Sequence, residues 1–343
     1  MQKVRAIIHL GNIRYNATLF KALTKRTLCA VVKANAYGHG AEEVVNALEG
    51  IADFFAVALI EEGLAIQTAA CGREILVFTP PTDEEELYTL AANGLLASVG
   101  SVACAQQIAA FCNRYKIPLS VHLKINTGMN RYGMEAEETA SVCKLFAAAP
   151  YVRVRGIYTH LCECSMERAE KQIQIFKQAI ATCKRYFPSV VSHLGGTYAA
   201  MLGEKLLFDA VRIGLGLYGY VPCESDLKLR RAMSVYAKTV AQRECRFGGL
   251  GYGSEGALHG EQISVLRFGY ADGFLRQRKN GADGWQTQEN ALCMDACLRS
   301  EAKGLGEWQC ILSDAEETAR IANTIPYEVL CAATRRAEMI YTL

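Results

Sequence analysis

Residues 31–40 read Val-Val-Lys-Ala-Asn-Ala-Tyr-Gly-His-Gly, so a lysine stands where a β-branched apolar run ends. The valines are typical of a buried strand, and the glycines that follow predict a turn into an amphipathic helix at Ala41. Lys33 is therefore expected at the carboxyl end of a strand, which is where parallel α/β proteins bind ligands. This position makes Lys33 a candidate reactive amine; the alternative for a lysine taken alone is a surface charge or an ion-pair partner.

Short apolar runs alternate with longer amphipathic stretches on both sides of this segment. Strands are predicted over Cys29–Lys33, Phe54–Leu59, Ile75–Phe78, Leu95–Val99, Leu119–Ile125, Val152–Thr159, Val190–Leu194 and Ala210–Ile213. Helices are predicted between them, over Ala41–Leu48, Ile60–Ala69, Asp83–Ala92, Val102–Tyr115, Glu135–Ala147, Met166–Tyr186 and Tyr198–Leu202. Strict β-α alternation predicts a parallel sheet, and eight repeats favour closure into a TIM-type (β/α)8 barrel over an open doubly wound sheet.

The pattern changes after Pro222. Ser234–Thr239 and Ile263–Arg267 alternate or run apolar with no long helix between them, and glycines cluster at Gly248–Gly256. This pattern predicts a smaller, mostly β C-terminal domain. The predicted fold class is thus α/β, with a barrel followed by a β domain.

We place the domain boundary near residue 222, which divides the chain into a barrel of residues 1–222 and a β domain of residues 223–343. The strand-like segment Val4–Leu10 precedes the first barrel helix. It either opens the barrel or pairs with the β domain.

Composition limits the classes of function. With 51% hydrophobic and 21% charged residues, the 343-residue chain can bury a large core. Its 37 basic residues nearly balance 35 acidic ones without runs of like charge, which argues against a nucleic-acid partner. The most apolar stretch, Ile51–Ile60, is well short of the roughly 18 residues that a membrane span needs. The first residues lack a signal-peptide pattern, so a cytoplasmic protein without a membrane partner is expected.

The chain contains fourteen cysteines, a number high enough to raise the question of disulfides or a metal site. Most lie within apolar runs, as Cys29, Cys143 and Cys331 do, where a reduced thiol behaves as a small hydrophobe. Cys162 and Cys164 form a C-x-C pair, and Cys293 and Cys297 stand four apart, but neither makes the paired C-x-x-C set of a zinc site. No metal is expected.

Residues 31–40 closely resemble the cofactor-lysine motif of alanine racemases, in which the lysine forms a Schiff base with pyridoxal 5′-phosphate (PLP). Three later strand ends resemble alanine racemase segments in the same order: Lys124–Arg131 (Lys-Ile-Asn-Thr-Gly-Met-Asn-Arg), Tyr158–His160 and Val211–Gly219. The resemblance extends over essentially the whole chain. It implies an isomerase, a PLP-dependent amino-acid racemase with Lys33 as the cofactor lysine and one catalytic base.

The resemblance also assigns the groups around the cofactor. Arg212 would face the pyridine nitrogen, with His193 supporting it and His160 beside the catalytic tyrosine. Because a guanidinium stays protonated, it donates to the ring nitrogen and cannot readily protonate it, which favours simple proton exchange at Cα over transamination. The residues implied for the phosphate are Tyr37, Thr197, Gly214, Leu215 and Tyr327, where Thr197 replaces the more usual serine.

Racemisation needs a proton donor on each face of a planar carbanion, so a second base is required. The matching residue is Tyr252 in Gly249–Ser254. A tyrosine, with a reference pKa of about 10, needs the favourable field that His160 and Arg212 would supply.

The remaining assignments concern the substrate. Arg131 would orient the substrate carboxylate, and Lys124 matches a lysine that is often carbamylated to position that arginine. Met294 and Asp295 would also meet the carboxylate, and Tyr270 would line the passage by which substrate enters. In the family, Tyr252, Met294 and Asp295 serve the other subunit's site, which implies a head-to-tail homodimer with shared active sites.

The chain departs from the family pattern at several positions. Asn126 replaces aspartate, Asn130 replaces glycine, and Ala291-Leu292 replaces Gly-Arg. These changes bear on substrate contacts more than on the cofactor site. They also leave a non-catalytic PLP-binding descendant as an alternative.

Serine racemases of the vancomycin-resistance type share most of these motifs. They tend to carry a smaller residue at the position of Tyr327, so Tyr327 favours alanine over serine or a broad substrate range. A PLP carrier protein would lack the β domain, and a fold-type III decarboxylase would need an acidic partner in place of Arg212. The expected function is interconversion of L- and D-alanine, which supplies D-alanine for the peptide of peptidoglycan.

Overall fold

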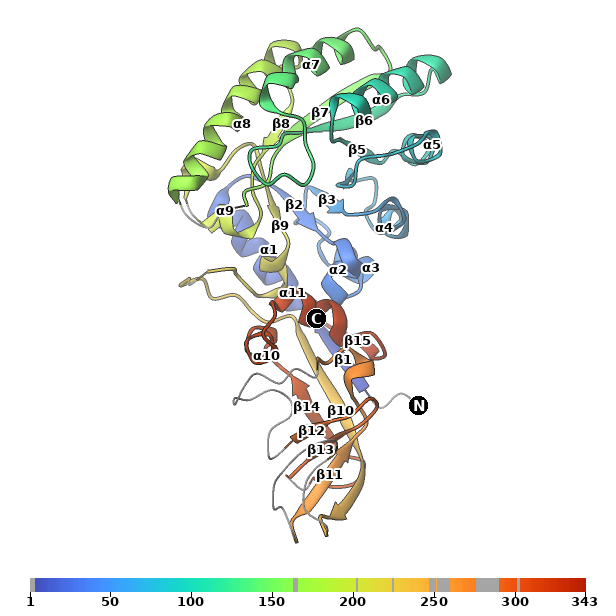
Figure 1. The fold of residues 1–343 in the computed structure, drawn as a ribbon, viewed down its shortest axis with the longest axis vertical. Coiled ribbons are helices and arrows are strands. Elements are labelled where there is room, and N and C mark those ends of the chain that lie inside the picture. The colour runs from blue at the N-terminus through green and yellow to red at the C-terminus, as the bar shows by residue number, and fades with distance from the viewer. Residues whose placement is uncertain are drawn as a thin grey trace.

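The computed structural model describes residues 4–162, 166–201, 203–223, 225–246, 251, 260–275, 290–300 and 303–343. Two parts are visible, a barrel surrounded by helices and a β domain (Figure 1). Among the described residues, no helix combines the length and apolar character that crossing a bilayer requires.

Eight parallel strands close into a barrel, which confirms the predicted fold. In barrel order they are β2 (Thr27–Val31), β3 (Phe54–Val57), β4 (Ile75–Val77), β5 (Leu96–Val99), β6 (Leu119–Lys124), β7 (Val152–Tyr158), β8 (Val191–His193) and β9 (Ala210–Ile213). Each predicted strand is present with ends within two residues of the prediction. Pairing of Thr27 in β2 with Ala210 in β9 closes the barrel.

Helices follow the strands around the barrel. They are α1 (Leu10–Thr24), α2 (Lys33–Gly38), α3 (Ala41–Ala47), α4 (Ile60–Ile66), α5 (Glu84–Ala92), α6 (Val102–Tyr115), η1 (Ala136–Glu138), α7 (Thr139–Ala147), α8 (Met166–Tyr186), α9 (Thr197–Met201), η2 (Glu204–Leu206) and η3 (Leu215–Tyr218). Side-chain caps fix some of the starts: Asp83 accepts from the Glu86 N–H and Ser101 from the Cys104 N–H. The helix predicted over Glu135–Ala147 is divided into η1 and α7.

In its described residues, the β domain is built on a seven-stranded sheet. Its strands are β1 (Val4–His9), β10 (Met233–Glu244), β11 (Gln262–Leu266), β12 (Asn290–Leu292), β13 (Cys297–Arg299), β14 (Trp308–Leu312) and β15 (Glu338–Thr342). β1 pairs antiparallel with β10 and parallel with β15 before the chain enters α1. The described chain therefore runs from this sheet at β1 through the barrel and back to the sheet at β10.

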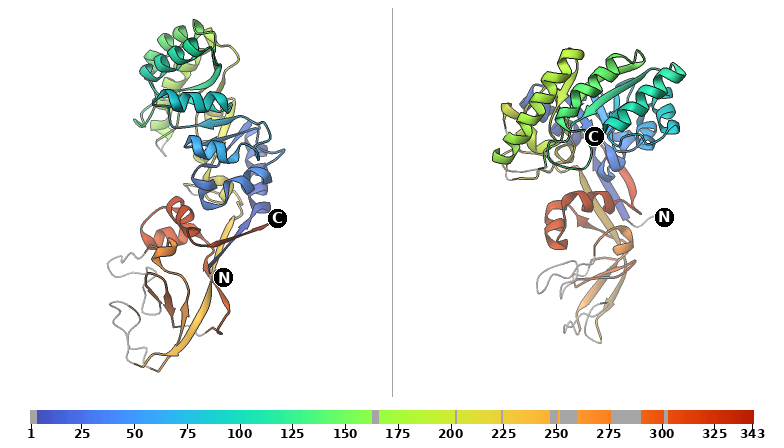
Figure 2. Two further views of the ribbon diagram at one scale, coloured as in Figure 1. Left: turned by 90° about the vertical axis from the view of Figure 1, so that its right-hand side faces the viewer. Right: turned by 45° about the horizontal axis from the view of Figure 1, so that its top comes forward.

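Short helices accompany the strands of the β domain. They are η4 (Tyr270–Asp272), α10 (Ala315–Ala322) and α11 (Pro326–Ala333). Both views in Figure 2 place α10 and α11 between the sheet and the barrel, and α11 contacts α2, the segment that begins at Lys33.

Among the described residues no disulfide is found. Cys29 and Cys143 are buried as expected, but Cys331 is exposed. The prediction for Cys331 was wrong because its apolar run lies on α11, where helical spacing buries Val329, Leu330 and Ala333 and turns Cys331 outward.

Polar side chains occupy part of the barrel interior. Ser98 Oγ lies 2.7 Å from Tyr158 Oη, and His122 Nδ1 lies 3.0 Å from His193 Nε2. The Tyr158 ring stacks on His193 with centroids 5.0 Å apart. Burial, followed by the charge of Arg212, lowers the pKa of His122 to about 3 and the pKa of His193 well below its usual range. Both rings are therefore neutral at neutral pH.

A third buried histidine, His39, closes the segment that begins at Lys33. Its Nδ1 lies 3.0 Å from the carbonyl oxygens of Ala36 and Tyr37, and its ring stacks on Tyr218 with centroids 4.4 Å apart. A carbonyl can only accept, so Nδ1 carries the proton. Burial lowers the pKa of His39 to about 4.

Acid is expected to destabilise the fold through these histidines. The pKa of His39 is about 4 in the folded chain against an ordinary value of 6.5, so below pH 6.5 the unfolded chain binds more protons. The free energy of unfolding should therefore fall as the pH falls from about 6.5 towards about 4, by up to about 1.4 kcal/mol per pH unit for each such histidine. Urea unfolding at a series of pH values measures this slope.

The matched control is His39→Asn, which keeps a side-chain N–H for the two carbonyls and removes the titrating ring. Its slope should be shallower than that of the unsubstituted protein by up to about 1.4 kcal/mol per pH unit. Equal slopes for the two proteins would contradict the assignment of a neutral buried His39.

Candidate active site

The predicted strand-end residues meet at the carboxyl end of the barrel. Lys33 follows β2, Lys124 ends β6, His160 follows β7 and Arg212 lies in β9. Their charges act on one another: burial, then Arg212, Lys124, Arg131 and Lys33, lower the pKa of His160 to about 3. The structure thus brings together residues that are up to 179 positions apart in the sequence, from Lys33 to Arg212.

Arg212 is buried and held from several sides. Nη2 donates to the carbonyl oxygens of Thr159 (2.7 Å) and Leu194 (3.2 Å), and Nη1 donates to that of His193 (3.1 Å). Nη1 also lies 2.8 Å from His193 Nδ1, and Nη2 lies 3.2 Å from His160 Nδ1. None of the hydrogen bonds found among the described residues uses Nε. The contacts fix the guanidinium plane through Nη1 and Nη2.

These contacts also decide where the histidine protons lie. A guanidinium only donates, so His193 must accept at Nδ1 and carry its proton on Nε2. Nε2 then donates to His122 Nδ1, 3.0 Å away. His160 likewise accepts from Arg212 at Nδ1, which leaves its own N–H on Nε2.

Lys33 opens an unusual backbone segment. Ala34, Asn35, Ala36 and Tyr37 have φ between 52° and 53°, and so form a turn of left-handed helix. For residues other than glycine this conformation costs about 1–2 kcal/mol each, so surrounding contacts must hold the turn. The sequence predicted only a glycine turn at residues 38–40, because it gave no local signal for a left-handed run.

The turn places Tyr37 among the other residues implied for a phosphate. The Tyr37 hydroxyl lies 2.7 Å from where a Cβ on Gly214 would stand, so a larger residue at position 214 would require Tyr37 to move. The Tyr37 and Tyr327 rings have centroids 5.7 Å apart, and Thr197 Oγ1 accepts from the Gly216 N–H at 3.0 Å.

Leu215 begins η3, and the first N–H groups of a helix lack intrahelical partners. Phenol and hydroxyl groups, a glycine and free backbone N–H groups are the donor set that suits a phosphate. The residues present therefore fit the phosphorylated cofactor that the sequence implies.

The two lysines of the site are shifted towards the neutral amine. Burial and the neighbouring Arg131 lower the pKa of Lys33. Burial, then Arg212 and Arg131, lower the pKa of Lys124 to about 7. Lys124 Nζ donates to the Ile125 carbonyl at 2.9 Å and lies 5.3 Å from the centroid of the Tyr158 ring.

The two asparagines that depart from the family pattern contact each other. Asn126 Nδ2 donates to Asn130 Oδ1 at 2.9 Å, and Asn126 Oδ1 accepts from the Asn130 and Gly128 N–H groups at 3.0 and 3.1 Å. Asn126 Nδ2 also donates to Glu135 Oε1 at 2.9 Å. This network holds the loop that carries Arg131, the residue after Asn130.

The β-domain residues form a separate group. The Tyr270 N–H donates to the Cys293 carbonyl at 3.1 Å, which places Tyr270 beside the Met294 loop. Asp295 Oδ1 accepts from Arg336 Nη2 at 2.9 Å. In the described part of the chain, no hydrogen bond or ion pair joins Tyr270, Met294 or Asp295 to Lys33 or Arg212. Tyr252 and most of the Gly248–Gly256 cluster lie outside the described residues.

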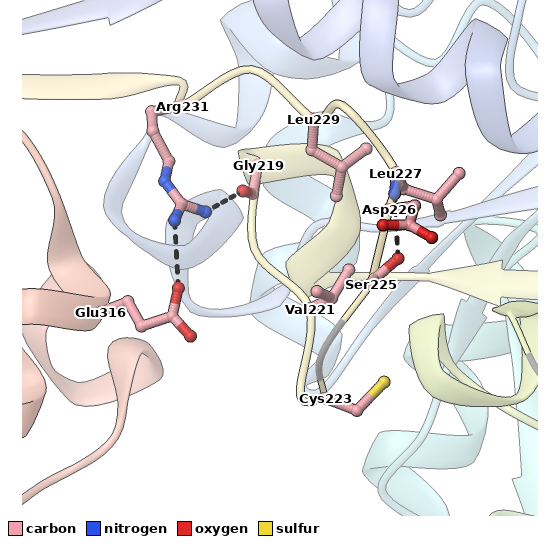
Figure 3. A pocket seen from close by; sticks show the side chains of 9 residues that line it. All are labelled: Gly219, Val221, Cys223, Ser225, Asp226, Leu227, Leu229, Arg231 and Glu316. Carbon is pink, nitrogen blue, oxygen red and sulfur yellow. Dashed lines mark hydrogen bonds and ion pairs between the residues drawn. The ribbon is translucent and has the colours of Figure 1, made fainter.

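A surface cavity of about 680 Å³ lies elsewhere, and no predicted site residue lines it. Its Arg231 is already paired with Glu316 at 3.0 Å and donates to the Gly219 carbonyl (Figure 3). Within the described ranges, no group of three or more His, Cys, Asp or Glu side chains is arranged to hold a metal ion.

Sequence reasoning missed Glu62, whose carboxylate contacts the turn after Lys33. Its Oε1 accepts from the Ala34 N–H at 2.6 Å. The available signal was its place three residues after Leu59, the residue before α4, because a glutamate at that spacing commonly bonds back to the start of its helix.

Comparison with known proteins identifies the family. A family model described as the alanine racemase N-terminal domain matches residues 8–222, and one described as the alanine racemase C-terminal domain matches residues 232–341. "Alanine racemase 2" of Oceanobacillus iheyensis is 31% identical, over 97% of this chain and 92% of that protein.

Solved structures agree with the sequence comparison. The alanine racemase of Clostridium difficile 630 has a TM-score of 0.89 and 29% identity, covering 100% of this chain and 96% of that one. A complex of the same protein with cycloserine has a TM-score of 0.86 and 28% identity over the same shares of the two chains. Since both domain models match in order over most of its length, the chain belongs to the alanine racemase family.

Proposed function

We propose that this protein is a PLP-dependent isomerase that interconverts L- and D-alanine by a two-base mechanism. The observation that carries the proposal is the pair Lys33 and Arg212 at one end of the barrel, within segments that match the family. Serine is the second candidate substrate, because the family resemblance extends to serine racemases. Tyr327, a large residue beside Tyr37, favours alanine.

PLP, when bound, supplies the electron sink that acidifies the proton on the substrate Cα. Lys33 would hold it covalently, and Tyr37, Thr197, Gly214, Leu215 and Tyr327 would hold its phosphate. Arg212 would donate to the pyridine nitrogen through Nε. His193 would keep the guanidinium in place by accepting from Nη1 at 2.8 Å, and His160 by accepting from Nη2 at 3.2 Å.

Lys33 is suited to moving a proton on one face of the substrate. An amine acts as a base only when neutral, and burial together with Arg131 lowers the pKa of Lys33 towards that state. The Lys33 amine would take up or release the proton on that face of the substrate.

Tyr252 of the partner subunit would serve the opposite face, in a head-to-tail homodimer with shared active sites. We assign it to the partner because the family pattern does so. Met294 and Asp295 would approach the substrate carboxylate from the partner as well, and Tyr270 would line the passage to the site. This assignment goes with a division of the chain near residue 222, in which residues 1–222 hold the barrel together with the strand β1 that pairs with the β domain, and residues 223–343 form the β domain that would supply the second base.

Arg131 and Lys124 complete the substrate side. Arg131 would orient the substrate carboxylate. Lys124, with a pKa of about 7, presents a substantial fraction of neutral amine near neutral pH. Such an amine can add to CO₂ and release a proton, giving the carbamate that would pair with Arg131.

The biological role we propose is supply of D-alanine for cell-wall peptide. The small-molecule partner would be alanine, with serine as the second candidate. We expect the protein to carry out this role in the cytoplasm.

Chiral analysis of products tests the function. Purified, PLP-loaded protein is given L-alanine and L-serine separately, with its visible absorbance recorded beside the assay. We expect D-alanine to form faster than D-serine. Dominant D-serine would move the assignment to the serine racemases, and bound cofactor without any D-product would overturn racemase activity in favour of a non-catalytic descendant.

Substitution of the two bases tests the mechanism. Lys33→Ala should abolish covalent cofactor binding and activity together. Tyr252→Phe should keep the cofactor but lower racemisation by about 10²–10⁴-fold, the usual effect of losing a general acid–base group. Tyr88→Phe, on the exposed face of α5, is the matched control and should behave like the unsubstituted protein. Full activity of Tyr252→Phe in both directions would refute the two-base assignment.

A further inference from the structure

We propose that Glu62 is a positioning residue for Lys33. The Glu62 carboxylate holds the left-handed turn that directs the lysine to the cofactor. The inference rests on the proposed function of Lys33. It assigns a role to a residue that lies outside the motifs identified from the sequence.

Glu62 joins two neighbouring strand ends. Its Oε1 accepts from the Ala34 N–H at 2.6 Å, in the segment that follows β2. Its Oε2 accepts from the N–H groups of Ala58 (2.7 Å) and Leu59 (3.1 Å), which follow β3. One carboxylate therefore ties the residue after Lys33 to the end of the adjacent strand.

The bond to Ala34 acts where the backbone is strained. Ala34 is the first of four non-glycine residues with positive φ, and its N–H belongs to the peptide that carries the Lys33 carbonyl. A bond to an ionised acceptor is shorter and stronger than one between neutral groups, which suits a turn that is unfavourable by itself. At the far end of the turn, His39 Nδ1 donates to the Ala36 and Tyr37 carbonyls at 3.0 Å. The turn is thus held at both ends.

The charge of Glu62 also acts on Lys33. The charged or titratable groups that act on the pKa of Lys33 are Arg131, Glu62 and Cys331, and Lys33 in turn acts on the pKa of His160. Glu62 and Cys331 raise the pKa of Lys33, whereas burial and Arg131 lower it. Removing the carboxylate should therefore lower the pKa of Lys33 further.

Glu62→Gln is the variant that separates these effects from simple packing. It keeps the size and one acceptor oxygen, but it loses the charge and turns an amide N–H₂ towards backbone N–H groups. Glu61→Gln is the matched control, because Glu61 is the preceding, exposed residue of the same helix. Both variants are prepared with PLP and compared with the unsubstituted protein.

The first readout is the attachment of cofactor to Lys33. Borohydride reduction followed by peptide mass spectrometry gives the fraction of Lys33 that bears a pyridoxyl group, over a range of pH. We expect Glu62→Gln to release cofactor about tenfold faster, because a change of that size corresponds to the loss of one charge-assisted hydrogen bond. The labelled fraction of Lys33 should fall as well. The second readout is kcat per bound cofactor, expected to fall about tenfold with KM little changed. Glu61→Gln should match the unsubstituted protein in both.

The outcomes separate this inference from the proposed function. If the unsubstituted protein is labelled at Lys33 and racemises alanine, but Glu62→Gln equals Glu61→Gln in labelling and in kcat per bound cofactor, the inference fails and the function stands. A lower melting temperature of Glu62→Gln with both readouts unchanged also overturns it, because that is a purely structural role. No label on Lys33 of the unsubstituted protein overturns both.

Glu62→Asp covers the case in which Glu62→Gln does not fold. Aspartate keeps the charge but is one methylene too short to reach Ala34 and Ala58 together. For Glu62→Asp we expect the labelled fraction of Lys33 and kcat per bound cofactor to be lower than for Glu61→Gln but above zero. Values equal to those of Glu61→Gln would refute the need for a carboxylate that reaches both strand ends.

Discussion

The buried guanidinium of Arg212 constrains the whole site. A permanent charge inside a barrel must be surrounded by acceptors, and Arg212 finds them in three backbone carbonyls and two histidine nitrogens. Those histidines can accept only while neutral, so burial and the charge of Arg212 act in the same direction on His193 and His160. The arginine thereby decides both the protonation state and the tautomer of its neighbours.

Burial and the arginines of the site shift two nearby lysines towards the neutral amine. Arg212 and Arg131 follow burial in lowering the pKa of Lys124 to about 7, and Arg131 follows burial in lowering that of Lys33. A cationic, largely desolvated pocket is costly to build, but it converts lysines from fixed charges into groups that can exchange protons. The carboxylate of Glu62 limits this shift at Lys33, so the pKa of the lysine depends first on burial and then on the opposed charges of Arg131 and Glu62.

The barrel and the residues at its strand ends could be predicted because their signals are local. Apolar period and β-α alternation located all eight strands, and motif resemblance located Lys33, Lys124, His160 and Arg212. The left-handed turn after Lys33 could not be predicted, because four non-glycine residues adopt it in a setting of tertiary contacts that includes Glu62 and His39. Cys331 was misplaced for a related reason: its apolar run does not reveal which face of α11 it occupies.

Asn126 and Asn130 depart from the family sequence pattern, and their contacts with each other explain how the fold accepts both changes. Position 130 has φ of 57°, a conformation that glycine adopts freely and that asparagine tolerates better than most residues. An aspartate at position 126 would have only acceptors, and could not donate to Asn130 Oδ1 and Glu135 Oε1 as the Asn126 amide does. Each asparagine is thus accommodated by the other, and the loop still presents Arg131 beside Lys33 and Lys124. Taken one at a time, the two changes weaken the resemblance to the family pattern. Taken as a hydrogen-bonded pair, they preserve the loop that carries Arg131.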